Sequence, residues 1–186
     1  MREILNKILN VSNTELDTLN TQFINQYNIQ FDSRFFHLAA GREHYRILMY
    51  VSSILNKEII FDVGTNRCFS AAALSFSMKN LIKSFDIKKI LMINPILPRV
   101  QYIIGDATQD EQLIKSTFAF LDTDHDGIFE NIFINKLREI KWNGILMLDD
   151  IKQKGAMTEF WNSISEEKYD LTSKGHWNGT GAVYFE

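Results

Sequence analysis

The sequence predicts an α/β fold: a doubly wound, mostly parallel sheet with helices on both faces and an antiparallel C-terminal hairpin at one edge. Between residues 41 and 150, short apolar runs alternate with segments of helical periodicity. That alternation favours parallel strands joined by helices. From residue 169 onward two extended runs flank the sequence NGTG, residues 178–181. This composition indicates a hairpin turn.

The 186 residues are enough for one domain with a single core, since 45% of them are hydrophobic. Residues 1–34 carry apolar positions at helical spacing and should form an N-terminal helical segment, followed by the sheet domain in residues 35–186. The first residues lack the continuous apolar stretch of a signal peptide, and no later run has the length of a membrane span. We therefore expect a cytoplasmic protein without membrane contact.

Five strands are expected in the parallel part of the sheet, at residues 58–63, 81–87, 100–107, 116–124 and 142–150. Each ends at or near an aspartate, and these are Asp62, Asp86, Asp106, Asp122 and Asp149. Ligands of an open parallel sheet bind beyond the carboxyl ends of its strands. Any single aspartate is well explained as a helix cap, but five at one edge are not. The edge is therefore a candidate site.

The stretch FDVGTNRCFSAAALS, residues 61–75, predicts a strand, a glycine turn and a closely packed helix. Gly64 permits a tight turn and close approach of a ligand to the backbone. A dinucleotide fingerprint needs G-x-G-x-x-G, whereas Gly64 is followed here by Thr65, Asn66, Arg67 and Cys68. The stretch therefore does not favour an NAD enzyme.

The same stretch resembles the first motif of class I S-adenosylmethionine (SAM)-dependent methyltransferases, D-x-G-x-x-x-G-x-S. It matches at Asp62, Gly64 and Ser70, and Cys68 replaces the second glycine. The resemblance implies a Rossmann-like class I methyltransferase fold with residues 35–186 as the SAM-binding domain. Asp86 would then bind the ribose hydroxyls, and Asp106 would lie beside the adenine amino group. The cofactor-binding residues that it implies are Glu43, Asp62, Gly64, Thr65, Asn66, Ser70, Asp86, Ile87, Asp106, Ala107 and Asp122.

The stretches FLDTDHDGIFE and LMLDDIK indicate an acidic cluster. If the strands before them are neighbours, Asp122, Asp149 and Asp150 converge on one small volume. Three carboxylates so close repel one another unless they share a cation. Oxygen ligands favour magnesium, calcium or manganese. The alternative is that DTDHDG is only a solvated turn and that Asp149 and Asp150 cap the next helix.

This arrangement resembles the metal-dependent branch of the O-methyltransferases, and the sugar enzymes most of all, because their D-x-x-H element corresponds to Asp122 and His125. The resemblance implies that Asp122, Asp149 and Asp150 are metal ligands and that His125, together with Asp122, is catalytic, with His125 as general base. It further implies SAM and Mg²⁺ as cofactors and a hydroxylated small molecule or sugar as the methyl acceptor. His44 and His176 are weaker candidates for the site.

Two other functions remain open. Cys68 in place of the motif glycine could mark a catalytically inactive methyltransferase-like scaffold. A methyltransferase acting on RNA or protein is the other alternative, although a formal net charge of -3 and a pI near 5.8 make nucleic acid an unlikely partner. The short loops favour an acceptor site that is open or completed by a partner subunit, so a homo-oligomer is among the expectations.

Overall fold

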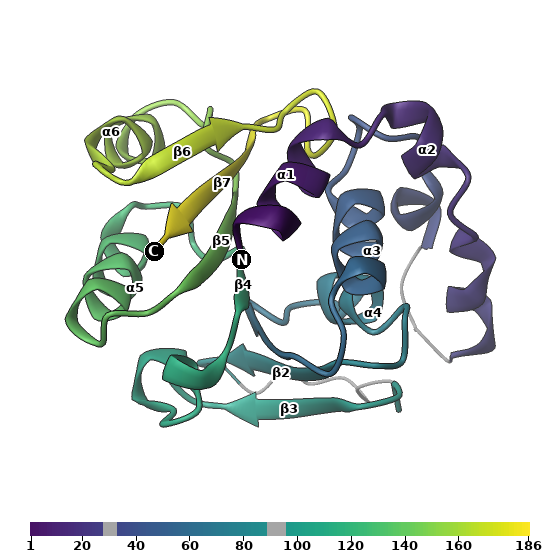
Figure 1. The fold of residues 1–186 in the computed structure, drawn as a ribbon, viewed down its shortest axis with the longest axis horizontal. Coiled ribbons are helices and arrows are strands. Elements are labelled where there is room, and N and C mark those ends of the chain that lie inside the picture. Colours follow the sequence, from purple (N-terminus) through teal and green to yellow (C-terminus); the bar gives the residue numbers. More distant parts are fainter. Residues whose placement is uncertain (28–32, 89–95) are drawn as a thin grey trace.

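The computed structural model describes residues 1–27, 33–88 and 96–186. It contains one seven-stranded sheet with the strand order β3-β2-β1-β4-β5-β7-β6 (Figure 1). The strands are β1 Ile59–Val63, β2 Leu81–Asp86, β3 Val100–Ile104, β4 Phe118–Leu121, β5 Gly144–Asp149, β6 Glu167–Asp170 and β7 Thr180–Phe185. Strands β1 to β5 are parallel, and β7 runs antiparallel between β5 and β6. The predicted fold class is confirmed.

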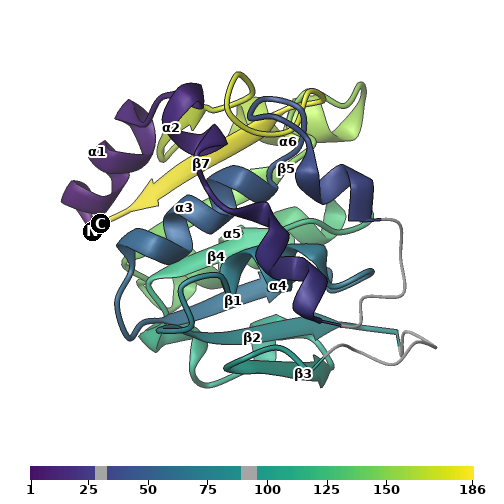
Figure 2. The ribbon, with the colours of Figure 1, turned by 90° about the vertical axis from the view of Figure 1, so that its right-hand side faces the viewer.

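Helices cover both faces of this sheet (Figure 2). The α-helices are α1 Arg2–Asn10, α2 Asn13–Asp17, α3 Tyr45–Ile54, α4 Phe69–Leu74, α5 Ile128–Glu139 and α6 Ala156–Ser163. Short 3-10 helices are η1 Thr21–Gln26, η2 Ser33–His37, η3 Ala107–Gln109 and η4 Leu113–Lys115. One core lies under α1 to α4 and the other under α5 and α6. Because both faces are covered, β4 and β5 up to Leu148 are apolar rather than alternating.

The N-terminal segment is part of the main core. Leu5, Ile8, Leu16 and Ile24 are buried in the same cluster as α3, α4 and one face of the sheet. Arg2 pairs with Glu167 of β6, at 2.7 Å between guanidinium and carboxylate, so the first helix is tied to the last strands. Among the residues that the structure describes, none of the helices combines the length and apolar composition needed to cross a bilayer.

The C-terminal hairpin is present, but its turn is not NGTG. The chain between β6 and β7 spans residues 171–179, and Thr180 and Gly181 already belong to β7. A Cβ on Gly181 would lie 2.6 Å from the ring of Trp161, so this glycine makes room for packing. Of the two glycines in NGTG, Gly179 has a positive φ, +112°, which glycine favours in a turn, and Gly181 does not. The sequence NGTG thus divides between the end of the connecting loop, residues 178–179, and the start of β7, residues 180–181.

Candidate functional site

The turn after β1 is built around Gly64. The amides of Gly64 and Thr65 both donate to the carbonyl of Phe85 on β2, at 2.9 and 3.0 Å. Gly64 has φ +101°, and an added Cβ would lie 1.7 Å from the carbonyl oxygen of Asp122. Glycine is therefore required twice, once for the backbone conformation and once because the chain after β4 passes so close. The same contact fixes Asp122 against the turn.

Cys68 adopts the glycine-like backbone that the motif position demands, with φ 64° and ψ 13°. For a residue with a side chain this costs about 1 kcal/mol. The thiol is buried, and burial raises its pKa to about 11. It does not line either of the two cavities described below. The cysteine therefore replaces the glycine without obstructing a ligand, which weakens the reason for the scaffold alternative.

Asp62 lies beneath this turn and supports it from inside the protein. Its carboxylate accepts a 2.6 Å hydrogen bond from Ser84 Oγ, which in turn lies 2.7 Å from Thr65 Oγ1. Burial raises the pKa of Asp62 to about 7, although hydrogen bonds from Ser84 and Ser70 oppose the shift. Asp62 lines neither cavity, so it acts on any ligand through the turn rather than by contact.

Asp62→Asn should reveal this buried carboxyl through the pH dependence of stability. An aspartate whose pKa is higher in the folded than in the unfolded state loses stability as pH rises from about 4 to about 7. Asparagine does not ionise. We therefore expect the free energy of unfolding of the variant, relative to the wild type, to increase by about 2 kcal/mol between pH 5 and pH 8. Urea unfolding at both pH values measures this, and a pH-independent difference would contradict it.

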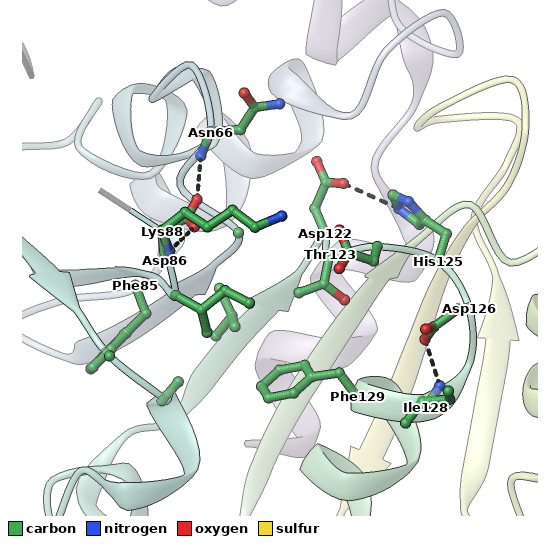
Figure 3. Close-up of a pocket in the computed structure, with 16 residues that line it drawn as sticks. Asn66, Phe85, Asp86, Lys88, Asp122, Thr123, His125, Asp126, Ile128 and Phe129 are labelled. Carbon is green, nitrogen blue, oxygen red and sulfur yellow. Dashed lines mark hydrogen bonds and ion pairs between the residues drawn. The ribbon is translucent and has the colours of Figure 1, made fainter. Parts of the chain in front are cut away.

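A cavity of about 740 Å³ opens at the carboxyl ends of β1, β2 and β4. This is within the size range of sites for small molecules and cofactors. Figure 3 shows Asp86 on one side of it and Asp122 with His125 on the other. The residues predicted for the site that line it are Gly64, Asn66, Asp86, Ile87, Ala107, Asp122 and His125. The structure therefore brings together seven predicted residues from four separate segments.

Asp86 is held in a fixed orientation at this cavity. Its Oδ2 accepts a hydrogen bond from the Asn66 amide at 3.2 Å, and its Oδ1 accepts one from the Lys88 amide at 2.9 Å (Figure 3). Each carboxylate oxygen has a second lone pair for a ligand hydroxyl. Ile87 and Phe129 supply apolar surface to the same cavity. The combination suits a ligand with adjacent hydroxyls and a flat apolar ring.

Asp106 is a predicted site residue that the structure places elsewhere. Its Oδ1 accepts hydrogen bonds from the Thr108 amide and hydroxyl, both at 2.8 Å, and so caps η3. It does not line the cavity, whereas its neighbours Gly105 and Ala107 do. The structural alternative, a helix-capping aspartate, describes this residue.

A second cavity, of about 190 Å³, lies on the other side of the glycine turn. Its walls include the aromatic residues Phe35, Tyr45 and Phe69 and the predicted residues Thr65 and Ser70. The two cavities share Gly64, Asn66 and Asp122 along their boundary. Two ligands could therefore meet at Asp122.

Three imidazoles and three carboxylates meet behind this boundary, and we call them the His–Asp cluster. Its members are His44, Asp122, His125, Asp149, Asp150 and His176. His125 Nε2 lies 3.2 Å from Asp122 Oδ1 and 3.9 Å from Asp150 Oδ2. Pairing of β4 with β5 brings the three aspartates to one region, but no donor set of the described residues contains all three: Asp122 and Asp149 share one set, and Asp149 and Asp150 share another.

His44 and His176 enter the cluster from distant segments. His44, the residue before α3, has its Nδ1 3.3 Å from Asp149 Oδ1. His176, in the loop before β7, has its Nδ1 3.2 Å from the same oxygen and 2.9 Å from Asp150 Oδ1. Glu43 lies behind them, 4.0 Å from His176 Nε2, and does not line the large cavity. Local sequence patterns gave these histidines little weight because only the tertiary structure brings them to Asp149.

The cluster is balanced by opposite charges. Burial lowers the pKa of each imidazole, but the carboxylates outweigh burial and raise the pKa of all three, that of His176 to about 10. Burial likewise raises the pKa of Asp149, yet His44 and His176 more than reverse this and lower it. The imidazoles and the carboxylates thus stabilise one another's charged forms.

The cluster also has the donor atoms of a metal site. Three overlapping sets each bring one donor atom per residue within 4.8 Å of one another: His44 with Asp122 and Asp149, His125 with Asp149 and Asp150, and Glu43 with His44 and His176. Both ring nitrogens of His44 and Oδ1 of Asp150 are buried without a hydrogen bond from any described residue. A cation would be a partner for one nitrogen of His44 and for Oδ1 of Asp150, since the two nitrogens of one imidazole point apart and cannot bind the same ion.

The strand order, the glycine turn and the cavity beyond the carboxyl ends of the strands define a doubly wound α/β protein with a ligand site at its switch point. In sequence, the chain matches no family model and no curated protein. Solved structures share its fold. One is an O-methyltransferase from Bacillus cereus in complex with S-adenosylhomocysteine (SAH), which is 15% identical to this chain with a TM-score of 0.57. The match covers 92% of this chain and 100% of the Bacillus cereus chain.

Two further solved structures agree. The SAH-bound methyltransferase PaMTH1 from Podospora anserina is 14% identical, with a TM-score of 0.55 over 76% of this chain and 77% of that one. The O-methyltransferase TomG from Streptomyces achromogenes, in complex with SAM and involved in tomaymycin synthesis, is 10% identical, with a TM-score of 0.54 over 98% and 95% of the two chains. At these identities the likeness establishes the class I methyltransferase fold.

Proposed function

We propose that this protein is a SAM-dependent methyltransferase that methylates a hydroxyl oxygen of a small molecule or sugar with the help of a divalent cation. One observation carries the proposal: the cavity beside Asp86 and the smaller aromatic cavity meet at Asp122, which also belongs to the His–Asp cluster. A methyl donor and an acceptor bound on the two sides of Asp122 would adjoin a base and a group of cation ligands.

The large cavity would hold the cofactor. Asp86, oriented by two backbone amides, offers acceptors to paired ribose hydroxyls. Ile87, Ala107 and Phe129 offer apolar surface to the adenine ring. Gly64 lines this cavity with its backbone, and the place of the missing side chain is taken by the carbonyl of Asp122. SAM supplies an electrophilic methyl group and leaves as SAH.

His125 would take the proton of the acceptor hydroxyl. It lines the large cavity and lies 3.2 Å from Asp122, so it is oriented at the boundary where the two ligands meet. Its pKa is raised by Asp122 and Asp150, against the effect of burial. A divalent cation held by these aspartates would lower both the pKa of the hydroxyl and that of His125, which favours the neutral base near pH 7.

The smaller cavity would hold the acceptor. Phe35, Tyr45 and Phe69 offer aromatic walls to a ring compound, and Asp122 offers an oxygen near its hydroxyl. A small acceptor is favoured over nucleic acid, because the chain has a net charge of -3 and the site is rich in carboxylates. Structural neighbours that are O-methyltransferases support oxygen as the methylated atom.

Calorimetry with SAH and methyl-transfer assays test the proposal together. We expect SAH binding in the micromolar range and transfer to one or more members of a panel of catechols and sugars. Transfer should fall at least about 100-fold in EDTA and in Asp149→Ala. If millimolar SAH fails to bind, the enzyme proposal is wrong and the scaffold alternative stands. Transfer that is indifferent to both EDTA and Asp149→Ala would exclude the cation and keep the methyltransferase.

A further inference from the structure

The donor set of the His–Asp cluster is rich in nitrogen as well as oxygen. Three of the four histidines of the chain belong to it, and they come from three different segments. The fourth, His37, lies apart, with its Nδ1 2.9 Å from Thr21 Oγ1. Three carboxylates alone would be an ordinary magnesium site. Three imidazoles beside them change which ion the site prefers.

His44 is the member that a purely structural role explains least. It is 3% exposed, and neither ring nitrogen has a hydrogen bond from the described residues. A buried polar atom without a partner costs about 1 to 3 kcal/mol. Its nitrogens face the carboxylates instead, with Nδ1 3.3 Å from Asp149 and Nε2 4.0 Å from Asp122. Only one nitrogen of an imidazole can bind a given ion, and Nδ1, the nearer of the two to a carboxylate, is the candidate ligand.

We propose that His44 and His176 are nitrogen ligands of the metal site and that the site therefore binds a first-row transition ion, such as Mn²⁺, Fe²⁺, Co²⁺ or Zn²⁺, in preference to Mg²⁺. The inference rests on the cation that belongs to the proposed function and names its class. Imidazole is a good ligand for these ions, whereas Mg²⁺ prefers oxygen. In this proposal a transition ion takes the place of the magnesium or other divalent cation expected from the sequence.

The distances agree with this assignment. Nδ1 of His44 and Nδ1 of His176 lie 3.3 and 3.2 Å from the same Asp149 oxygen. Adjacent ligands in an octahedral shell with bonds of about 2.1 Å are about 3 Å apart. His44 lines the smaller cavity, His125 lines the large one, and His176 lines neither. In the proposed arrangement His44 and His176 hold the ion at the edge of the acceptor cavity, and His125 stays at the boundary beside Asp122.

The test uses the full chain without a histidine tag, first freed of metal by EDTA. Co²⁺ is titrated while its visible d–d absorption is followed, and Zn²⁺, Mn²⁺ and Mg²⁺ then compete for the site. We expect Co²⁺ to bind at least about 100-fold more tightly than Mg²⁺. His44→Gln and His176→Gln should each weaken Co²⁺ about 10- to 100-fold and leave Mg²⁺ affinity unchanged. His37→Gln, outside the cluster, should match the wild type.

The outcomes separate this inference from the proposed function. Equal affinity for Co²⁺ and Mg²⁺, unaffected by either histidine variant, overturns the nitrogen ligands and leaves a magnesium-dependent methyltransferase. Failure to bind any of the ions overturns both the inference and the cation of the proposed function, while SAH calorimetry still decides on the methyltransferase. If His44→Gln does not fold, His176→Gln carries the test, because His176 lies in a loop and its side chain is 16% exposed, compared with 3% for His44.

Discussion

Gly64→Ala should destabilise the protein by more than about 3 kcal/mol and abolish SAH binding. The new Cβ would lie 1.7 Å from the carbonyl oxygen of Asp122, which is backbone and cannot rotate away. To this overlap is added the strain of an alanine at φ +101°. Relief requires the turn and the chain at Asp122 to separate, and that would disrupt both cavities. Urea unfolding and SAH calorimetry measure the two effects.

Gly155→Ala is the matched control for Gly64→Ala. Gly155 also has a positive φ, +84° with ψ -129°, but nothing lies within 4 Å of its added Cβ. This variant should therefore lose only backbone strain, about 1 to 3 kcal/mol, and keep SAH affinity. The difference between the two variants isolates the contact with Asp122. Equal losses would mean that the close approach seen at Gly64 does not hold in solution.

Asp86→Ala should weaken SAH binding about 100-fold with little change in stability. The carboxylate is expected to accept charged hydrogen bonds from ribose hydroxyls, each worth about 1.5 to 3 kcal/mol. Its contacts within the protein are the amides of Asn66 and Lys88, at the edge of the cavity. Calorimetry with SAH measures the affinity, and thermal unfolding shows whether the fold is retained.

Asp126→Ala is the control for the loss of a negative charge at the same cavity. Asp126 also lines it and accepts a 2.8 Å hydrogen bond from the Ile128 amide, so it resembles Asp86 in charge and in binding a nearby amide (Figure 3). It is outside the set of predicted cofactor residues. We expect less than a threefold change in SAH affinity. A loss as large as that of Asp86→Ala would show that general charge, not a ribose contact, determines binding.

The fold and the cavity residues at the strand ends could be predicted from local sequence patterns. Burial on both faces makes the strands apolar, and an aspartate stands where two of them end: Asp86 is the last residue of β2, and Asp122 follows β4. Asp86 and Asp122 were therefore predictable as cavity residues, together with the turn at Gly64. Asp106 met the same rule and yet caps η3, because an aspartate after a strand satisfies either role.

What the sequence determined alone is the order of strands and helices along the chain, the glycine turn after the first strand and the carboxylates at the strand ends, since each depends on residues adjacent in the chain. The tertiary structure decided the rest. Pairing of β4 with β5 sets Asp122 beside Asp149, and the packing of α3 and of the loop before β7 adds His44 and His176. These contacts join segments that are far apart in the sequence, so the local pattern of apolar and polar residues cannot predict them.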